Sequence, residues 1–533
     1  MSELNPLVLA DIFLGKAETK PDHQIVIFEG GDIREDEYRT YQDLWLNAQR
    51  IAAGLIANGM RYGDRFSILI RNHPEFIETM IAASLTGCVF IPIDPRTKGR
   101  KLAYTLNNSE SKGIICADYS VLQLEEIRQE LTGLEWIWLM ETGEDGKRLT
   151  SNDIAGSETL SEILGQPEVS IDRQLKDPMD PVQIIYTSGT TGDPKGVVIP
   201  NVRLGAGIMG GAALGFEPGD KPYTGLSLTH GNAQSLTFMP AIGMDLPVVI
   251  SQKFTKSRLW DITRKYGCTV FNLLGGMTTA IYSDPIKEND GDNPVRMVCA
   301  AGMPANIWVK FEERFNVKVL EMYGAVDGFG LIVNAPGAGP VGSFGKAGPN
   351  LEVAIVDEED KECPRGEMGE LIGRQLGAQP KIEYLGNEAA SSKKTRGGWV
   401  RTGDICHMDE NGYLYFDYRK GGGLRHNGDF VSPSFVEQVL AEHPQIDDVY
   451  VYGVTAASGA PGEKDVVGAI VGLDGTELDI PSIFAYCKKH LEANFIPSYL
   501  QVVKEIPKTA SEKPQERFLL EAFSVDGEGI YTS

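Results

Sequence analysis

The chain of 533 residues is long enough for more than one domain, and its 42% hydrophobic and 23% charged residues are typical of a soluble globular protein. Its 74 acidic and 50 basic residues give a formal charge of −24. A surface this acidic repels phosphate backbones and anionic lipids, which argues against nucleic acid or a membrane as the main partner.

The seven cysteines do not form a disulfide framework, because their number is odd and no CxxC pair occurs. Most have apolar neighbours, as Cys88 and Cys116 do, which is typical of core residues in a reducing compartment. The N-terminal segment has an acid at Glu3 where a signal peptide needs basic residues, and no apolar stretch reaches the length of a transmembrane helix. We therefore expect a cytoplasmic protein without a membrane span.

Short apolar segments alternate with amphipathic ones through the first four hundred residues. This pattern predicts an α/β fold with a parallel sheet. The predicted helices cover residues 47–58, 75–86 and 100–107, and the predicted strands cover 64–71, 89–93, 113–117, 247–251, 269–274 and 317–321.

The pattern changes after residue 400. Residues 419–423 are too rich in glycine for a helix or a strand and are our hinge candidate. We predict strands at 412–416, 449–454 and 466–473, helices at 434–441 and 480–493, and a polar tail. The resulting division is a large domain over 1–418, a hinge over 419–423 and a small α+β domain over 424–533.

The strongest chemical signal is the segment IIYTSGTTGDPKG at residues 184–196. An apolar strand runs into a loop with four hydroxyl side chains, glycines and Lys195. Glycines let backbone N–H groups approach an anion, hydroxyls donate to phosphate oxygens, and the lysine adds positive charge. A polar surface turn is the alternative, but a surface turn would not require this combination. The spacing also differs from that of a GxxxxGK[ST] P-loop.

This segment is similar, nearly residue for residue, to the phosphate-loop signature of the adenylate-forming superfamily, which includes acyl-CoA synthetases, peptide-synthetase adenylation domains and firefly luciferase. Four more blocks follow in the order that the superfamily has them. They are residues 321–328, which resemble the YGxTE block, 399–404, which match WxRTGD, Arg419 with the loop 428–432, which resemble the hinge and the RxGENIS-type loop, and 507–513, which resemble PKTxSGK.

The resemblance implies an ATP-dependent carboxylic acid–CoA ligase that forms AMP, by way of an acyl-adenylate and then a thioester. The cofactors that it implies are ATP, Mg²⁺ and coenzyme A as a co-substrate, and the other substrate is a small-molecule carboxylic acid. It also implies a large N-terminal α/β domain with a small mobile C-terminal domain. Homodimer formation is left open.

Site residues follow from the resemblance position by position. Lys513 would stabilise the charge that develops when the carboxylate attacks the α-phosphorus. His230 would line the acyl pocket and the pantetheine tunnel, and Asp327 would hold Mg²⁺ against the phosphates. The nucleotide-binding set is Thr187, Ser188, Gly189, Thr190, Thr191, Lys195, Gly302, Tyr323, Gly324, Asp404, Arg419 and Gly428.

Within this set, Tyr323 would stack on adenine, Asp404 would accept hydrogen bonds from both ribose hydroxyls, and the backbone at Gly302 would pass close to adenine. Outside the motifs each residue has a plainer interpretation. Tyr323 would be a core aromatic residue, Asp404 a turn residue, and Lys513 a surface lysine.

The acid-binding region is predicted around His230 and residues 273–279. The pattern H-x-N-A-Q with the following L-G-G-M segment resembles the carnitine and crotonobetaine CoA ligase branch. The plainer interpretation of His230 is a structural histidine.

Three positions depart from the superfamily pattern. Gly421 replaces the usual Asp or Lys of the hinge, Glu512 replaces the glycine before the catalytic lysine, and Val326 replaces a hydroxyl residue. These changes leave open unusual kinetics of domain alternation or the loss of one half-reaction. Two other functions stay open: an adenylation enzyme that loads a carrier-protein thiol, and a non-catalytic nucleotide-binding homologue. Against the first we set the lack of a fused carrier domain and of an aspartate that could be assigned to hold an amino-acid amine. Against the second stands the presence of Lys195, Asp404 and Lys513.

Overall fold

The computed structural model describes residues 4–31, 34–144, 149–187, 194–420, 424–426, 429–431, 433–457, 464–491, 493–509 and 512–533. Its contacts divide the chain into two compact units. Unit 1 comprises residues 1–272 and 381–393, and unit 2 comprises 273–380 and 394–533. Residues 421–423 of the hinge candidate lie outside the described residues, so the division at 419–423 stays a prediction.

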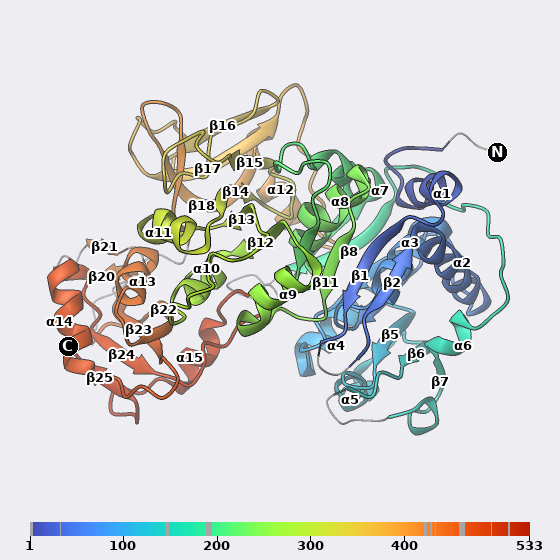
Figure 1. The fold of residues 1–533 in the computed structure, drawn as a ribbon, viewed down its shortest axis with the longest axis horizontal. Coiled ribbons are helices and arrows are strands. Elements are labelled where there is room, and N and C mark those ends of the chain that lie inside the picture. The colour runs from blue at the N-terminus through green and yellow to red at the C-terminus, as the bar shows by residue number, and fades with distance from the viewer. Residues whose placement is uncertain are drawn as a thin grey trace. The chain divides into compact units, whose positions relative to one another are not determined.

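Unit 1 contains a seven-stranded sheet in the order β7-β6-β5-β3-β4-β8-β9, in which every neighbouring pair is parallel except β8–β9. The parallel neighbours β5 and β6 are labelled side by side in Figure 1. The expected parallel α/β arrangement is therefore present. Its strands are β3 (Arg65–Leu69), β4 (Val89–Pro92), β5 (Gly113–Ala117), β6 (Trp136–Met140), β7 (Ser157–Thr159), β8 (Pro181–Thr187) and β9 (Lys195–Pro200).

A second run of strands in unit 1 has the order β12-β10-β11-β1-β2, with only the β1–β2 pair antiparallel. Its strands are β1 (Gln24–Glu29), β2 (Glu37–Thr40), β10 (Pro222–Thr224), β11 (Val248–Ser251) and β12 (Val270–Leu274), and the last two residues of β12 belong to unit 2. The α-helices are α1 (Leu9–Thr19), α2 (Tyr41–Ala57), α3 (Pro74–Thr86), α4 (Gly99–Asn108), α5 (Val121–Glu126), α6 (Leu160–Leu164), α7 (Asn201–Gly205), α8 (Met239–Met244), α9 (Leu259–Tyr266) and most of α12 (Glu388–Lys394).

Helix α2 begins six residues before the predicted start at residue 47. Thr40 and Asp43 form a capping box, in which the Thr40 hydroxyl accepts from the Asp43 N–H and the Asp43 carboxylate accepts from the Thr40 N–H. This box satisfies two backbone donors of the first turn and fixes the helix start at Tyr41.

In unit 2, β14 lies between a parallel neighbour, β13, and an antiparallel neighbour, β15. Four further strands form the antiparallel sheet β16-β17-β18-β19. The elements are α10 (Gly275–Tyr282), β13 (Met297–Ala301), α11 (Ala305–Phe315), β14 (Lys318–Gly324), β15 (Leu331–Asn334), β16 (Leu351–Val356), β17 (Gly369–Gln375), β18 (Val400–Met408) and β19 (Leu414–Arg419). The predicted strand at 412–416 begins two residues later, because Gly412 adopts a turn conformation with φ +84°.

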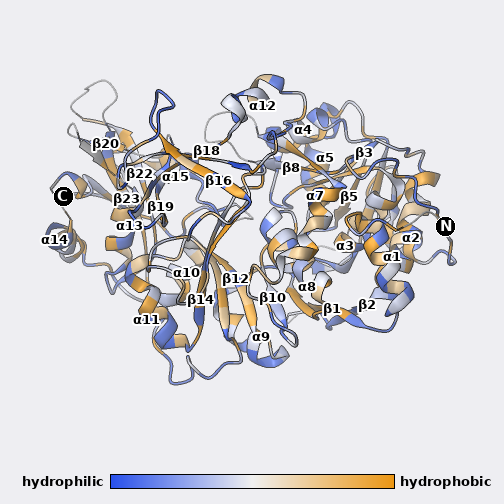
Figure 2. Ribbon diagram, turned by 90° about the horizontal axis from the view of Figure 1, so that it is seen from above, coloured by the Kyte–Doolittle hydropathy of each residue, from blue (hydrophilic) through white to orange (hydrophobic). Residues whose placement is uncertain are grey.

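The C-terminal part of unit 2 is the expected α+β domain, with a sheet in the order β22-β23-β24-β25. The tail predicted as merely polar instead contributes β24, α15 and β25, because Leu500 and Leu519 are buried in the two cores of this domain. The elements are β20 (Leu424–His426), β21 (Asp429–Val431), α13 (Pro433–Ala441), β22 (Ile446–Thr455), β23 (Lys464–Gly472), α14 (Ile480–His490), β24 (Tyr499–Val502), α15 (Glu516–Ala522) and β25 (Ile530–Thr532). In Figure 2 hydrophobic colour follows many of the strands, while the connecting loops are largely hydrophilic.

Candidate active site

Asp404 is the centre of a cluster in unit 2 that joins three predicted nucleotide-binding residues. It lies on β18 and is only 8% exposed. The Tyr323 hydroxyl, at the end of β14, donates to Asp404 Oδ2 at 2.6 Å. Arg419 is the direct cross-strand partner of Asp404 on β19, and its Nε lies 3.7 Å from Asp404 Oδ1. Strand pairing thus places a carboxylate, a phenol and a guanidinium side by side.

The Tyr323 ring is held by two phenylalanines that the sequence analysis missed. Phe344 stacks on it at a centroid distance of 4.7 Å, and Phe329 packs edge-on at 5.4 Å. Burial, and next the Asp404 carboxylate, raise the pKa of Tyr323 well above its usual value. The phenol is therefore protonated and acts as the donor to Asp404.

Gly302 lies directly after β13 with φ +97°, a conformation that favours glycine. Its N–H donates to Glu321 Oε1 at 2.6 Å, and the Met303 N–H donates to Glu321 Oε2 at 2.9 Å. Burial raises the pKa of Glu321 to about 8, and the two backbone bonds act in the opposite direction. Glu321 and Tyr323 are two residues apart on β14, so their side chains lie on the same side of the strand. The signal that could have revealed Glu321 is a carboxylate inside an apolar strand.

Lys513 lies near the same cluster, although it is more than a hundred residues away from Asp404 in sequence. Its side chain is exposed, yet the surrounding protein removes enough solvent to lower its pKa, and the Arg419 guanidinium lowers the pKa further. The Asp404 and Asp327 carboxylates oppose this shift. The structure therefore brings the predicted catalytic lysine within electrostatic range of the predicted ribose and metal acids.

The turn before Lys513 explains one departure from the superfamily pattern. Glu512 adopts φ +56°, a left-handed conformation in which glycine is unstrained. The turn is closed by the Thr509 N–H, which donates to the Lys513 carbonyl at 2.8 Å, and by the Glu512 N–H, which donates to the Thr509 carbonyl at 2.9 Å. Glutamate thus keeps the backbone shape that glycine would adopt more easily.

Asp327 forms an ion pair with a lysine that the sequence analysis did not single out. Lys394 Nζ lies 2.6 Å from Asp327 Oδ2. In the part of the chain that the structure describes, no group of three or more His, Cys, Asp or Glu side chains could hold a metal. Mg²⁺ is commonly bound by one or two carboxylates together with substrate phosphates and water. Asp327 therefore fits a metal that arrives with ATP better than it fits a resident ion.

In unit 1, the two ends of the phosphate-loop segment are held together. Thr187 on β8 pairs with Lys195 on β9, and the Thr187 hydroxyl donates to the Lys195 carbonyl at 3.4 Å. The Lys195 ammonium lies 5.5 Å from the centroid of the Tyr384 ring. Ser188, Gly189, Thr190 and Thr191 lie outside the described residues, as does Gly428 in unit 2.

His230 lies in a loop of unit 1 that is fixed by a buried asparagine. Asn72 donates to the Leu226 carbonyl and accepts from the Leu228 N–H. The half-buried His230 ring accepts from the Asn232 N–H at 3.3 Å, just before a π-helix over Ala233–Phe238. Such π-helical turns are frequent at functional sites.

Gly276, from the segment predicted to wall the acid site, belongs to α10 in unit 2. A Cβ atom at Gly276 would lie 3.9 Å from Lys508 Nζ, and Lys508 also forms an ion pair with Asp448. The lysine-containing C-terminal motif therefore lies beside the predicted acid-site helix.

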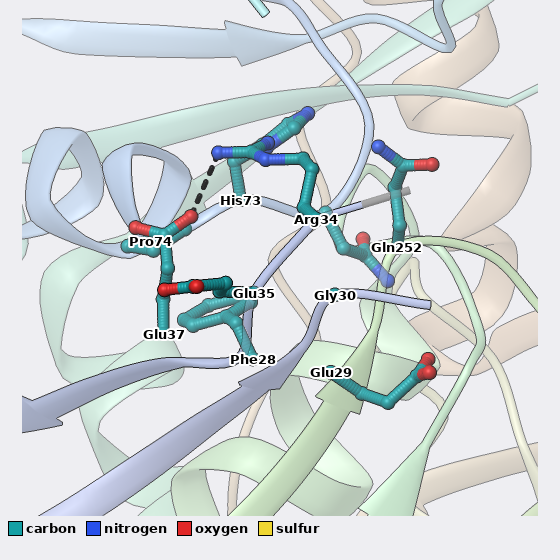
Figure 3. Close-up of a pocket in the computed structure, with 10 residues that line it drawn as sticks. Phe28, Glu29, Gly30, Arg34, Glu35, Glu37, His73, Pro74 and Gln252 are labelled. Carbon is teal, nitrogen blue, oxygen red and sulfur yellow. Dashed lines mark hydrogen bonds and ion pairs between the residues drawn. The ribbon is translucent and has the colours of Figure 1, made fainter. Parts of the chain in front are cut away.

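A small pocket in unit 1 lies apart from the predicted site residues, and none of them lines it. Arg34 crosses it and pairs with Glu37 (Figure 3), and it also contacts Glu144 and His73. The pocket has a volume of about 20 Å³, which has room for about one water molecule. This pocket is therefore too small for a nucleotide or an acyl group.

None of the described helices combines the length and the apolar character that crossing a membrane requires.

A crotonobetaine/carnitine–CoA ligase of Salmonella paratyphi B is 28% identical over 509 residues, which are 92% of this chain and 95% of that protein. The predicted resemblance to the carnitine and crotonobetaine CoA ligase branch is thus confirmed.

Two solved structures have the same fold. The anthranilate CoA ligase AuaEII, in complex with anthranoyl-AMP, matches with a TM-score of 0.83 and 21% identity over 96% of each chain. ATP-bound MatB from Rhodopseudomonas palustris matches with a TM-score of 0.78 and 21% identity over 96% of this chain and 98% of that one. The predicted α/β fold with a large N-terminal and a smaller C-terminal domain is confirmed.

The AMP-binding enzyme family matches residues 13–378, and the AMP-binding enzyme C-terminal domain matches residues 436–513. The first match alone covers more than half of the 533 residues. The chain therefore belongs to the AMP-binding enzyme family, as an enzyme of the AMP-forming acid–thiol ligase class.

Proposed function

We propose that this enzyme activates a small-molecule carboxylic acid with MgATP to an acyl-adenylate and then transfers the acyl group to coenzyme A. The observation that carries the proposal is the cluster in which Asp404 accepts from the Tyr323 hydroxyl and lies opposite Arg419, with Lys513 close enough for Arg419, Asp404 and Asp327 to influence its pKa. An ammonium within the electrostatic influence of a proposed ribose acid and a proposed metal acid is suited to a reaction at the α-phosphate of a bound nucleotide.

Each residue of the cluster has a chemical task in the first step. The Asp404 carboxylate accepts hydrogen bonds from the ribose hydroxyls, and the Tyr323 phenol orients it. Lys513 stabilises the negative charge on the acid and on the α-phosphate as the new bond forms and pyrophosphate leaves. The glycine at 302 lets the backbone approach the adenine, because a side chain there would be strained at φ +97°.

In the second step the thiol must reach the carbonyl carbon of the adenylate. In the first step Lys513 occupies the side of the adenylate from which the thiol would approach. We propose that the segment at 419–423 is the hinge that moves the C-terminal domain between the two steps. His230 would then line the route of the thiol.

The test is AMP release with a panel of acids that includes trimethylammonium acids of the crotonobetaine type, aromatic acids and short dicarboxylic acids. Each acid is supplied with ATP and Mg²⁺, and with coenzyme A, a phosphopantetheinylated carrier protein or no thiol. We expect acid-dependent pyrophosphate exchange, and AMP release that requires coenzyme A. Release with the carrier protein alone would favour a carrier-loading enzyme, and the absence of exchange with every acid would contradict the proposal.

A further inference from the structure

Lys394 and Asp327 form a shielded ion pair at the edge of the candidate active site. Lys394 is the last residue of α12, and Asp327 lies in the turn after β14. The Nζ–Oδ2 distance is 2.6 Å, and the side chains are only 13% and 16% exposed. Solvent and salt screen such a pair less than one on the open surface.

The same carboxylate is the one proposed to meet the metal of MgATP. An ammonium in contact with Oδ2 occupies a position on the oxygen that a cation would take. It also cancels the negative charge that attracts a divalent cation. A carboxylate cannot keep both partners at full strength, so the ion pair and the metal contact oppose each other.

We propose that Lys394 is a positioning residue that competes with the divalent cation of MgATP for Asp327. In the nucleotide-free enzyme Lys394 neutralises and fixes the acid, and MgATP binding exchanges the ammonium for the metal. This inference rests on the proposed function, because it assigns Asp327 to the metal side of the nucleotide. Its consequence is that Lys394 sets the concentration of free Mg²⁺ at which ATP binds.

The competition can be measured without turnover. ATP binding is followed by isothermal titration calorimetry in the absence of acid and thiol, at a series of free Mg²⁺ concentrations. The variants are Lys394→Met and Lys394→Gln, and the matched control is Lys393→Met, which removes the same charge from the exposed neighbouring residue. Thermal unfolding of each variant verifies the fold, and the glutamine variant keeps a polar side chain if methionine impairs it.

For both Lys394 variants we expect the Mg²⁺ concentration that gives half of the gain in ATP affinity to fall about threefold, the size of effect typical of one partly shielded ion pair. The Lys393 control keeps the wild-type value. In an Asp327→Asn background, removal of Lys394 has no further effect on the Mg²⁺ dependence.

An unchanged Mg²⁺ dependence in Lys394→Met, with normal ATP binding, overturns this inference and leaves the proposed function intact. Loss of ATP binding at every Mg²⁺ concentration also overturns it, because Lys394 would then be a phosphate ligand. If the wild-type protein itself binds no ATP, the proposed function fails, so the two failures are distinguishable.

Discussion

The Tyr323 hydroxyl donates to Asp404 Oδ2 at 2.6 Å and thereby connects β14 to β18. The bond fixes the carboxylate with one oxygen toward the phenol and the other toward Arg419. Because the phenol pKa is raised, the bond persists across the pH range in which an enzyme is usually assayed. The orientation of the acid is thus set before any nucleotide binds.

We predict that Asp404→Ala raises the KM for ATP by tenfold or more. Each charge-assisted hydrogen bond to a ribose hydroxyl contributes about 1.5–3 kcal/mol, and the variant has no acceptor for either hydroxyl. Tyr323→Phe keeps the acceptor and loses only its orientation, so its KM should rise by a few-fold. Initial rates of pyrophosphate exchange at varied ATP measure both, with Glu410→Gln as a control at an exposed acid. A wild-type KM in Asp404→Ala would remove Asp404 from the nucleotide site.

The sequence was sufficient to predict the position of each motif but not the partners that hold it. Tyr323, Asp404 and Lys513 were predicted from the resemblance of their motifs to those of the superfamily and from the order of these motifs, which are local features of the sequence. The Lys394–Asp327 pair and the stack of Phe344 on Tyr323 join distant segments, and no local pattern specifies such contacts. The sequence did not reveal that the tail around Leu500 and Leu519 is folded, because its strands and helix are too short to produce a clear hydrophobic period.

Glu321 should make the stability of the protein depend on pH. Its folded pKa of about 8 lies above the usual 4.5, so folding takes up a proton between these values. The stabilising contribution is complete below pH 4.5 and is lost as the pH rises through 8, by up to about 1.4 kcal/mol for each pH unit. We predict that the apparent melting temperature falls from pH 5 to pH 8 and that Glu321→Gln flattens this fall. An identical slope in the variant, measured by differential scanning calorimetry, would contradict the assignment.

Glu512→Gly should preserve or improve the turn that presents Lys513. The left-handed conformation at φ +56° costs a non-glycine residue about 1 kcal/mol, which glycine does not incur. We therefore expect pyrophosphate exchange at or above the wild-type rate, whereas the β-branched variant Glu512→Val should lower it. Activity lost in the glycine variant would mean that the Glu512 side chain itself has a catalytic task.

Lys513→Ala should separate the two half-reactions. Loss of the ammonium removes stabilisation at the α-phosphate, so pyrophosphate exchange should fall by about a hundredfold or more. Thioester formation from a chemically prepared acyl-adenylate should stay close to the wild-type rate, because that step no longer involves the attack on phosphorus. Lys504→Ala, at an exposed lysine of the same domain, is the control for both assays. An equal fall in both half-reactions would assign Lys513 a structural role.

The pH profile of the first half-reaction should report the protonation of Lys513. Its pKa lies below the usual 10.5, because the surrounding protein removes part of its solvent and because the Arg419 guanidinium is nearby, so the charged form is lost earlier than that of an ordinary lysine as the pH rises. We predict that the rate of pyrophosphate exchange declines on the alkaline side within the range below 10.5. Lys513→Arg keeps its charge there, because a guanidinium stays protonated above pH 12, so the alkaline decline should vanish whatever the absolute rate of the variant. Lys504→Arg should retain the wild-type profile, and an alkaline decline that persists unchanged in Lys513→Arg would place the titrating group elsewhere.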